Sequence, residues 1–162
     1  MTMIRPTTPQ DAEAIRRLAA AEPLFNAEET ACVEELLGDY LEMPDHNGYF
    51  FLTAERDGAV VGFACYGPTP LTQGTFDLYW IAVSQEHARQ GIGKALMKQV
   101  EMELRQAQAR ILVVDTSGRA AYAPTRAFYE RLGYHKTATV PDFYGPKDDL
   151  VIYTRRFVGT IL

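Results

Sequence analysis

The sequence of 162 residues has few of the features that mark disulfide-rich, metal-binding or membrane proteins. Its two cysteines, Cys32 and Cys65, have no second cysteine or histidine close by, so we expect free thiols and no metal. No apolar run approaches the length that crosses a membrane, so no membrane partner is expected. Residues 1–6 lack the apolar core of a signal peptide, which predicts a cytoplasmic protein.

Positive charge is not in excess either, because 16 Lys and Arg stand against 21 Asp and Glu and give a net charge of −5. A general nucleic-acid-binding protein usually shows a basic surface, so we expect no nucleic-acid partner. The charge is compatible with a cationic or small-molecule substrate. A chain of this length can bury one hydrophobic core without metal or disulfides, which predicts a single domain over residues 1–162.

Hydrophobic periodicity and turn signals predict alternating strands and helices. Helices are expected over residues 8–20, 27–43 and 125–132 and from the glycine turn at residue 91 through Leu104, and strands over residues 3–5, 49–55, 59–66, 75–83, 110–115, 134–140 and 150–157. Residues 141–149, rich in Pro, Gly and Asp, are expected to form a loop. This order indicates an α/β (α+β) fold in which helices cover both faces of a mixed sheet of about seven strands.

One segment joins a buried strand to a glycine turn and a helix. The apolar residues 78–83 precede Gly91-Ile92-Gly93, after which Ile92, Leu96, Val100 and Leu104 recur at every fourth position. At such a helix start, unpaired N–H groups and the positive end of the helix dipole both favour a phosphate. The segment therefore predicts binding of a phosphorylated cofactor.

Two common phosphate-binding motifs do not match this turn. A dinucleotide fingerprint requires a third glycine where the chain has Leu96, and a Walker loop requires Gly and Ser or Thr where it has Ala88 and Ala95. One alternative is a glycine turn that only permits close packing of helix and strand. The other is a loop that cradles a pyrophosphate while the preceding strand pairs with an amide-bearing chain.

Residues 81–84 (Ile-Ala-Val-Ser) and 89–96 (Arg-Gln-Gly-Ile-Gly-Lys-Ala-Leu), with residues 127–134 downstream, resemble the GNAT superfamily of acetyl-CoA-dependent N-acetyltransferases. The resemblance implies a single-domain GNAT fold with acetyl-CoA as co-substrate. It also implies transfer of the acetyl group to a primary amine, either a small molecule or a protein N-terminus. Many relatives dimerise, so a homodimer is compatible with it.

The resemblance further implies which residues contact the cofactor. Backbone N–H groups from Arg89 to Lys94 would hold the CoA pyrophosphate, and the strand at residues 81–83 would pair with the pantetheine amides. The chain departs from the family at Ala88, where Gln or Arg is usual, and at Tyr122, where Asn is frequent. The full set of implied cofactor contacts is Ile81, Ala82, Val83, Arg89, Gln90, Gly91, Ile92, Gly93, Lys94, Ala95, Thr125, Arg126 and Phe128.

Three residues are candidates for the chemistry. The resemblance indicates Tyr129 as the general acid that protonates the departing CoA, and the alternative is an aromatic side chain that packs on the sheet. Asp77 and Asp115 are candidate general bases, in strands where some GNAT members carry theirs. Asp115 at the end of an apolar strand is expected to have a raised pKa, and its alternative function is to cap the following turn. A water relay without a single base is a further alternative.

Acceptor specificity is expected from residues 25–43 and 142–149, which are acidic and aromatic. The second of these segments also resembles the C-terminal hairpin of the ribosomal-protein alanine acetyltransferases. Neither cysteine lies on a signature segment, so direct transfer is favoured over an acyl-enzyme. Alternatives are an acyl-CoA-binding sensor or scaffold without transfer activity and, if the missing third glycine is discounted, a nicotinamide-dependent enzyme.

Overall fold

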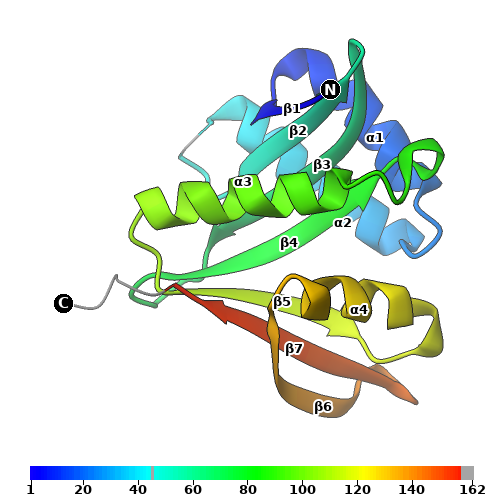
Figure 1. Ribbon diagram of the computed structural model, residues 1–162, viewed down its shortest axis with the longest axis vertical. Helices are drawn as coiled ribbons and strands as arrows, with labels where there is room; N and C mark the ends of the chain where they lie inside the picture. The colour runs from blue at the N-terminus through cyan, green and yellow to red at the C-terminus, as the bar shows by residue number, and fades with distance from the viewer. Residues whose placement is uncertain (45, 158–162) are drawn as a thin grey trace.

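A seven-stranded mixed sheet runs through the centre of the computed structural model, which describes residues 1–44 and 46–157 (Figure 1). Its order is β1-β2-β3-β4-β5-β7-β6, and only β4 and β5 are parallel neighbours. The strands are β1 (Thr2–Pro6), β2 (Phe50–Arg56), β3 (Ala59–Pro68), β4 (Thr75–Val83), β5 (Ile111–Ser117), β6 (His135–Gly145) and β7 (Asp148–Arg156). The mixed α/β prediction is thus confirmed.

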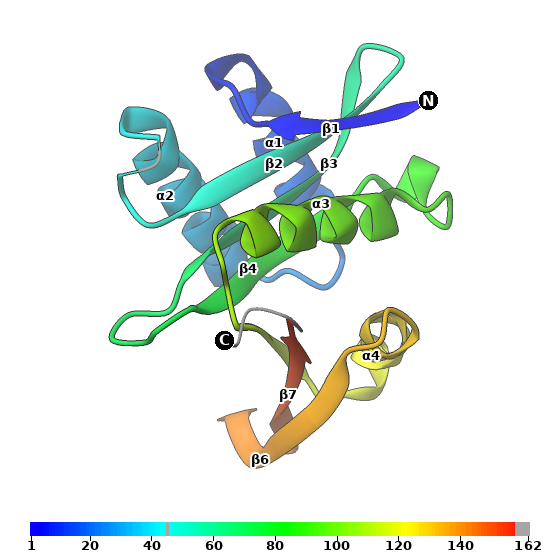
Figure 2. The ribbon, with the colours of Figure 1, turned by 60° about the vertical axis from the view of Figure 1, so that its left-hand side comes forward.

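Four helices cover the two faces of the sheet (Figure 2). They are α1 (Ala12–Ala21), α2 (Ala27–Glu42), α3 (Ile92–Gln106) and α4 (Ala123–Arg131), and short 3-10 helices lie at Pro9–Asp11, Gln85–His87 and Ala120–Tyr122. Helices α1 and α2 pack with one hydrophobic cluster and α3 and α4 with another, on opposite faces. We call these the α1/α2 face and the α3/α4 face.

The helix ends follow local sequence signals. The side chain of Asn26 accepts a hydrogen bond from the backbone of Glu29 at 2.8 Å and so caps α2. After α4 the chain passes through Gly133 at φ 90°, which glycine adopts without strain. Pro124 lies in the first turn of α4, which begins at Ala123, two residues before the predicted start.

The parallel strands β4 and β5 pair only along their first halves. Their register runs from Thr75 opposite Ile111 to Leu78 opposite Val114, after which each strand continues without pairing to the other. In the pairing of β3 with β4, the register shifts so that Tyr79 has no partner, which marks a bulge. The two strands therefore diverge, as the right side of Figure 1 shows, beside the start of α3. We call this divergence the strand opening.

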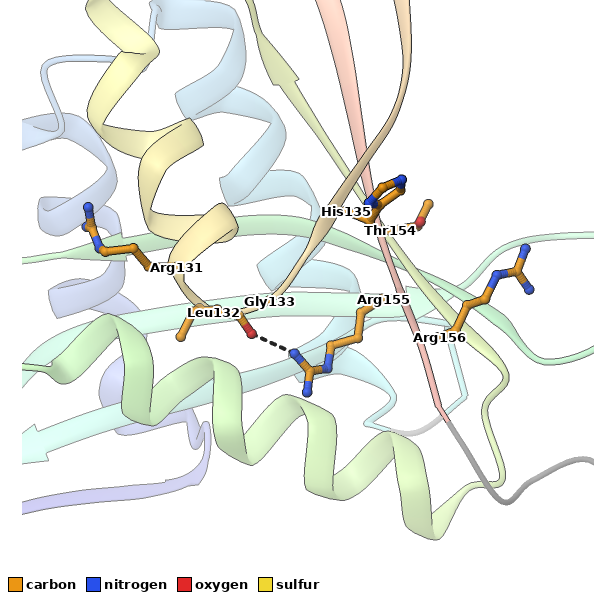
Figure 3. A pocket seen from close by; sticks show the side chains of 7 residues that line it. All are labelled: Arg131, Leu132, Gly133, His135, Thr154, Arg155 and Arg156. Carbon is orange, nitrogen blue, oxygen red and sulfur yellow. Dashed lines mark hydrogen bonds between the residues drawn. The ribbon is translucent and has the colours of Figure 1, made fainter.

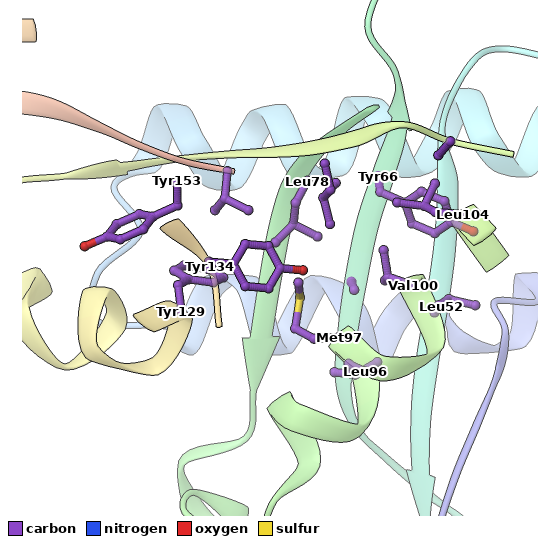
Figure 4. Packing of buried hydrophobic residues seen from close by; sticks show 14 of the residues in the cluster. Leu52, Tyr66, Leu78, Leu96, Met97, Val100, Leu104, Tyr129, Tyr134 and Tyr153 are labelled. Carbon is purple, nitrogen blue, oxygen red and sulfur yellow. The ribbon is translucent and has the colours of Figure 1, made fainter. Parts of the chain in front are cut away.

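The core on the α3/α4 face combines aliphatic and aromatic side chains. Leu96, Met97 and Val100 of α3 are fully buried against the sheet. Tyr129, Tyr134 and Tyr153 gather at the other end of the same cluster (Figure 4). Because Tyr129 packs α4 against Tyr153 of β7, and Tyr134 donates a hydrogen bond to Glu101 of α3, the helices on this face are held firmly against the sheet.

The predicted loop over residues 141–149 is wrong, because most of it is strand. Strands β6 and β7 continue to a short turn at Pro146-Lys147, with Lys147 at φ 62°. Their register shifts between Val140 and Gly145, where Asp142 has φ 55°. Pro, Gly and Asp usually indicate a loop, but a bulged hairpin accommodates the same residues without ending the ladder.

Candidate active site

The N-terminus of α3 is open to an anion. Gly91 precedes the helix with φ 79°, no side chain caps its first turn, and that turn contains no acidic residue. Helix α2 differs, because Asn26 caps it and Glu28 and Glu29 lie in its first turn. The backbone donors of α3 and the positive end of its dipole therefore remain available to a phosphate.

The two glycines of the turn have different functions. A Cβ at Gly91 would meet no atom within 4 Å, so the space beside this residue is empty and its positive φ suits glycine. A Cβ at Gly93 would lie 3.3 Å from the ring of Phe128, so Gly93 allows α4 to approach α3. Close packing therefore explains Gly93, whereas it does not explain Gly91.

The loop before Gly91 carries the other predicted pyrophosphate contacts. Arg89, at φ 63°, Gln90 and Lys94 are exposed around the start of α3. Arg56, at the end of β2, donates a hydrogen bond from its guanidinium to the Gln90 side chain. Ile92 is fully buried, and Ala95 is partly buried one turn further along the helix. Only backbone groups of these last two residues are placed to contact a ligand.

The predicted pantetheine strand forms one side of the strand opening. Ile81, Ala82 and Val83 pair with β3 through Ala64, Phe63 and Gly62, while no strand among the described residues pairs with their other edge. Ile81 and Val83 pack against the core of the α3/α4 face, and Ala82 is buried on the other. This open edge has the geometry that accepts an extended, amide-bearing ligand as an added strand.

Tyr129 lies on the α3/α4 face and is 3% exposed. Its ring packs against Phe128, Tyr134 and Tyr153 at centroid distances of 5.2, 5.8 and 6.0 Å. No other described residue forms a hydrogen bond with its hydroxyl, so the donor is unused within the described chain. Burial raises the pKa of Tyr129 far above its ordinary value, which keeps the phenol protonated at neutral pH.

Asp77 and Asp115 lie on the α1/α2 face. Asp77 is opposite Val113 in the register and lies between Phe76 and Leu78 of the other face. Asp115 follows Val113 by two residues, so both carboxylates belong to one face at the strand opening. The predicted acid and the predicted bases therefore lie on opposite faces of the sheet.

The two carboxylates have different environments. Asp77 accepts a hydrogen bond from Thr69 Oγ1 at 2.7 Å. Asp115 has no hydrogen bond or ion pair with another described residue, and desolvation followed by the charge of Asp77 raises its pKa. The turn-capping alternative for Asp115 is wrong, since Ser117 Oγ accepts the hydrogen bond from the Arg119 backbone at 3.1 Å.

The structure brings further residues to this face that the sequence interpretation did not single out for it. Tyr79 lies near Asp77 and contacts Tyr49 with ring centroids 5.7 Å apart. Burial, followed by the charge of Asp77, raises the pKa of Tyr79 to about 12. Because residues i and i+2 of a strand share a face, the spacing from Asp77 to Tyr79 was a usable signal. Tyr49 carried no comparable signal, because it directly precedes β2 and is far from Asp77 in the sequence.

The predicted contacts at α4 are only partly free to reach a cofactor. Thr125 lies in the first turn of α4, whose N-terminus has no side-chain cap. The guanidinium of Arg126 donates to the carbonyl oxygens of Ser117 and Arg119, both at 2.8 Å, and so fixes the connection from β5 to α4. Tyr122, in place of the usual Asn, donates its hydroxyl to the carbonyl of Leu24 at 2.9 Å.

A cavity of about 580 Å³ lies elsewhere, between the end of α4 and the last residues of β7 (Figure 3). Arg155 is already bound to the carbonyl of Leu132 at 2.6 Å and to Glu101 at 3.2 Å. Arg131 and Arg156 point away from each other in Figure 3, so the cations do not converge. This cavity does not provide an anion site comparable to the start of α3.

Residues 1–44 and 46–157 contain neither a cluster of metal ligands nor a membrane-spanning helix. No set of three or more His, Cys, Asp and Glu side chains is gathered there for a metal ion. Within the same residues, no helix combines the length and the apolar character that a bilayer crossing requires.

The fold of this chain matches that of known acetyltransferases. The profile of the Acetyltransferase (GNAT) family matches residues 13–134. A crystal structure assigned to that family, from Desulfovibrio desulfuricans, has a TM-score of 0.93 and 41% identity over 96% of this chain and 99% of that one.

Relatives of lower sequence identity are also acetyltransferases by name or share the fold. An uncharacterised N-acetyltransferase of Methanocaldococcus jannaschii is 29% identical over 107 residues, which are 65% of this chain and 65% of that relative. A Salmonella typhimurium structure with acetyl-CoA shares the fold, with a TM-score of 0.80 and 21% identity over 99% of this chain and 96% of that one. The family match over most of the chain and the 41% identical structure show that this protein belongs to the GNAT acetyltransferase family.

Proposed function

We propose that this protein transfers an acetyl group from acetyl-CoA directly to a primary amine. The observation that carries the proposal is the strand opening between β4 and β5, which has an unpaired edge and a chemically different group on each face. Tyr129, a buried proton donor, lies on the α3/α4 face, and Asp77 and Asp115 lie on the other. Such a division suits a reaction in which two substrates meet from opposite directions.

The α3/α4 face has the features that the cofactor requires. Backbone N–H groups from Arg89 to Lys94 bind the pyrophosphate at the uncapped start of α3. The empty space beside Gly91 leaves room for the phosphates. The open edge at residues 81–83 pairs with the pantetheine amides and directs the thioester into the strand opening.

The carboxylates prepare the amine. An amine is mostly protonated at neutral pH, so Asp77 or Asp115, directly or through water, must take a proton before the nitrogen attacks. The nitrogen then forms a bond to the acetyl carbon, and the carbon–sulfur bond breaks with its electrons on sulfur. The raised pKa of Asp115 brings it closer to that of an effective base at neutral pH.

Tyr129 stabilises the sulfur that leaves. Its hydroxyl has no competing hydrogen-bond partner among the described residues and stays protonated at neutral pH. A phenol is a weaker acid than a thiol, so the favourable contribution is a charge-assisted hydrogen bond to the developing thiolate. The ammonium loses two protons on its way to the amide, one before the attack and one after the new carbon–nitrogen bond has formed. One proton ends on the CoA sulfur, and the other leaves through the carboxylates to solvent.

The test combines cofactor binding with product formation. Calorimetry should detect acetyl-CoA binding and no comparable NADH binding, and mass spectrometry of a mixture of small amines and N-terminal peptides should detect a gain of one acetyl group. Binding without acetylation of any amine would instead favour a non-catalytic acyl-CoA-binding protein.

A pair of glycine variants separates binding from backbone strain. Gly91→Val places a branched side chain where the phosphates bind, and should weaken acetyl-CoA binding by about 30-fold or more. Gly58→Val is the matched control, because Gly58 also has φ 79° and open space around its Cβ, but lies in the β2–β3 turn. Equal loss of binding in both variants would contradict the assignment of the pyrophosphate to the start of α3.

A further inference from the structure

The α1/α2 face of the strand opening, where the acceptor amine would bind, carries more negative than positive charge. We define the acidic tyrosine cluster as the carboxylates Glu29, Asp77, Asp115 and Asp148 with the phenols Tyr49, Tyr79, Tyr122 and Tyr144. Its members come from α2, β4, β5, the β6–β7 hairpin and the segments before β2 and α4. Among the described residues, Arg119 is the cation whose charge acts on Glu29 and Tyr122 of this cluster.

Arg119 cannot neutralise all four carboxylates. Its guanidinium lies 3.3 Å from Asp148 and stacks over Tyr122 at 5.5 Å from the ring centroid. Asp148 also accepts a hydrogen bond from Ser117 Oγ. Glu29 and Asp115 form no ion pair with a described residue. Negative charge therefore remains in excess beside the place where the amine must react.

The excess charge has two poles. One is Asp77 with Asp115 at the strand opening, where two carboxylates on adjacent strands share a face. The other is Glu29 with Asp148, at the start of α2 and the start of β7. Tyr144 belongs to the same cluster, and burial, followed by the charges of Asp115, Asp148 and Glu29, raises the pKa of its phenol.

We propose that the acceptor is an amine with a second cationic group, whose reacting nitrogen lies at Asp77 and Asp115 and whose second cation lies at Glu29 and Asp148. This inference rests on the proposed function and specifies its substrate class. A second ammonium would relieve the repulsion that the unpaired carboxylates now impose, and the phenol rings add cation–π attraction. An aliphatic diamine and a peptide with a basic side chain next to its N-terminus share this chemistry.

Other acceptor classes fit the cluster less well. An amine with a neutral tail would leave half-buried Glu29 without a counter-ion. The lack of a counter-ion is unfavourable because burial already destabilises the charged form of Glu29 and so raises its pKa. An amine with a carboxylate tail would meet two carboxylates and one guanidinium at the second pole. The charge balance therefore favours a dication.

A substrate series tests the inference directly. Putrescine, butylamine and γ-aminobutyrate share a four-carbon chain and end in a cation, a methyl group and an anion, respectively. We expect kcat/KM for putrescine to exceed that for butylamine by about tenfold or more, and γ-aminobutyrate to be the poorest. The dipeptide amides Ala-Lys and Ala-Leu form the second arm, and the arm with the higher kcat/KM identifies the source of the dication.

Glu29→Gln tests the second pole with little change in shape. The ratio of kcat/KM for the dicationic acceptor to that for its neutral match should fall at least about fivefold. Glu28→Gln is the matched control, because Glu28 is the exposed neighbour on the same helix and lies outside the cluster, so it should keep the ratio. Thermal melting checks that both variants fold.

The outcomes are distinguishable. Equal kcat/KM for dicationic and neutral acceptors in both arms would overturn the inference and leave the proposed function intact. A dication preference that survives Glu29→Gln unchanged would overturn the assignment of the second pole. Failure of acetyl-CoA to bind would contradict the proposed function itself, and the inference would fall with it.

Discussion

The two faces of the sheet differ in charge, burial and hydrogen bonding where β4 and β5 diverge. On the α3/α4 face, an uncapped helix start is flanked by Arg89 and Lys94, and Tyr129 is buried with an unused donor. On the α1/α2 face, Asp77, Asp115 and Glu29 lie among tyrosines. One face suits an anion and the other suits a cation.

This separation explains how one small domain can bind two substrates of opposite charge. If the carboxylates lay beside the start of α3, they would repel the phosphates that its backbone donors bind. The sheet keeps the two charge types apart, and the strand opening is where they come together. Variants on the two faces should therefore have different kinetic signatures.

Tyr129→Phe should have the largest effect and addresses the α3/α4 face. Removing the hydroxyl retains the ring contacts with Tyr134 and Tyr153, so the fold should survive. We expect kcat to fall about 100-fold while acetyl-CoA affinity changes little. Pre-steady-state measurement of CoA release checks this expectation. Full turnover in the variant would eliminate Tyr129 as the group that stabilises the leaving sulfur.

Asp115→Asn addresses the opposite face and should lower kcat/KM about tenfold. Because the pKa of Asp115 is raised, the wild-type rate should decline toward acid pH at a higher pH than an ordinary Asp would produce. That decline should shift or vanish in the variant. Asp77→Asn is the matched comparison, and the variant whose pH profile loses the decline identifies the base.

The raised pKa of Asp115 also predicts a small dependence of folding stability on pH. A raised pKa means that the folded state binds the Asp115 proton more tightly than the unfolded state. Stability should therefore decrease as pH rises from the ordinary Asp pKa through the raised one. At neutral pH, Asp115→Asn should remove this cost and gain less than about 1 kcal/mol, because the side chain is solvent-exposed. Urea titration at several pH values measures it.

Gly93→Ala sharpens the contrast between packing and binding within the α3/α4 face. The new methyl group would lie 3.3 Å from the Phe128 ring, so Phe128 must move by a small amount. We expect a loss of about 1 kcal/mol in the free energy of unfolding, and less loss of acetyl-CoA affinity than in Gly91→Val. Thermal melting and calorimetry measure the two quantities. A reverse order of affinities would contradict the separate functions of the two glycines.

Tyr122→Phe should have the smallest effect. The variant removes the hydrogen bond to the carbonyl of Leu24, which joins the segment before α2 to the segment before α4. The expected cost is about 1 kcal/mol of stability, with a modest rise in KM for the amine and none for acetyl-CoA. A rise in KM for acetyl-CoA instead would place Tyr122 on the cofactor side.

The sequence predicted what is encoded locally. Gly91, the helix after it and the strand at residues 75–83 form one contiguous unit, so periodicity and the glycines were sufficient. The bulged end of the β6–β7 hairpin was predicted as a loop, because its Pro, Gly and Asp residues are read by local rules alone. Cytoplasmic location and a homodimer stay predictions from the sequence.

The acceptor side was harder to predict because it is assembled from distant segments. Glu29 and Asp148 are far apart in the chain and meet only through the sheet order. Asp115 was expected at the end of its strand, but β5 continues to Ser117; the expected rise of its pKa through desolvation is confirmed. No local pattern indicates that Tyr144 of β6 and Glu29 of α2 belong to one cluster.

A crystal structure with bound acetyl-CoA is the measurement that tests the account most directly. The account predicts the pyrophosphate on the backbone of residues 89–94, the pantetheine beside residues 81–83, and the thioester at the strand opening with Tyr129 on one side and Asp77 and Asp115 on the other. Acetyl-CoA bound elsewhere, such as in the cavity beside Arg155, or with its thioester away from the opening, would contradict it.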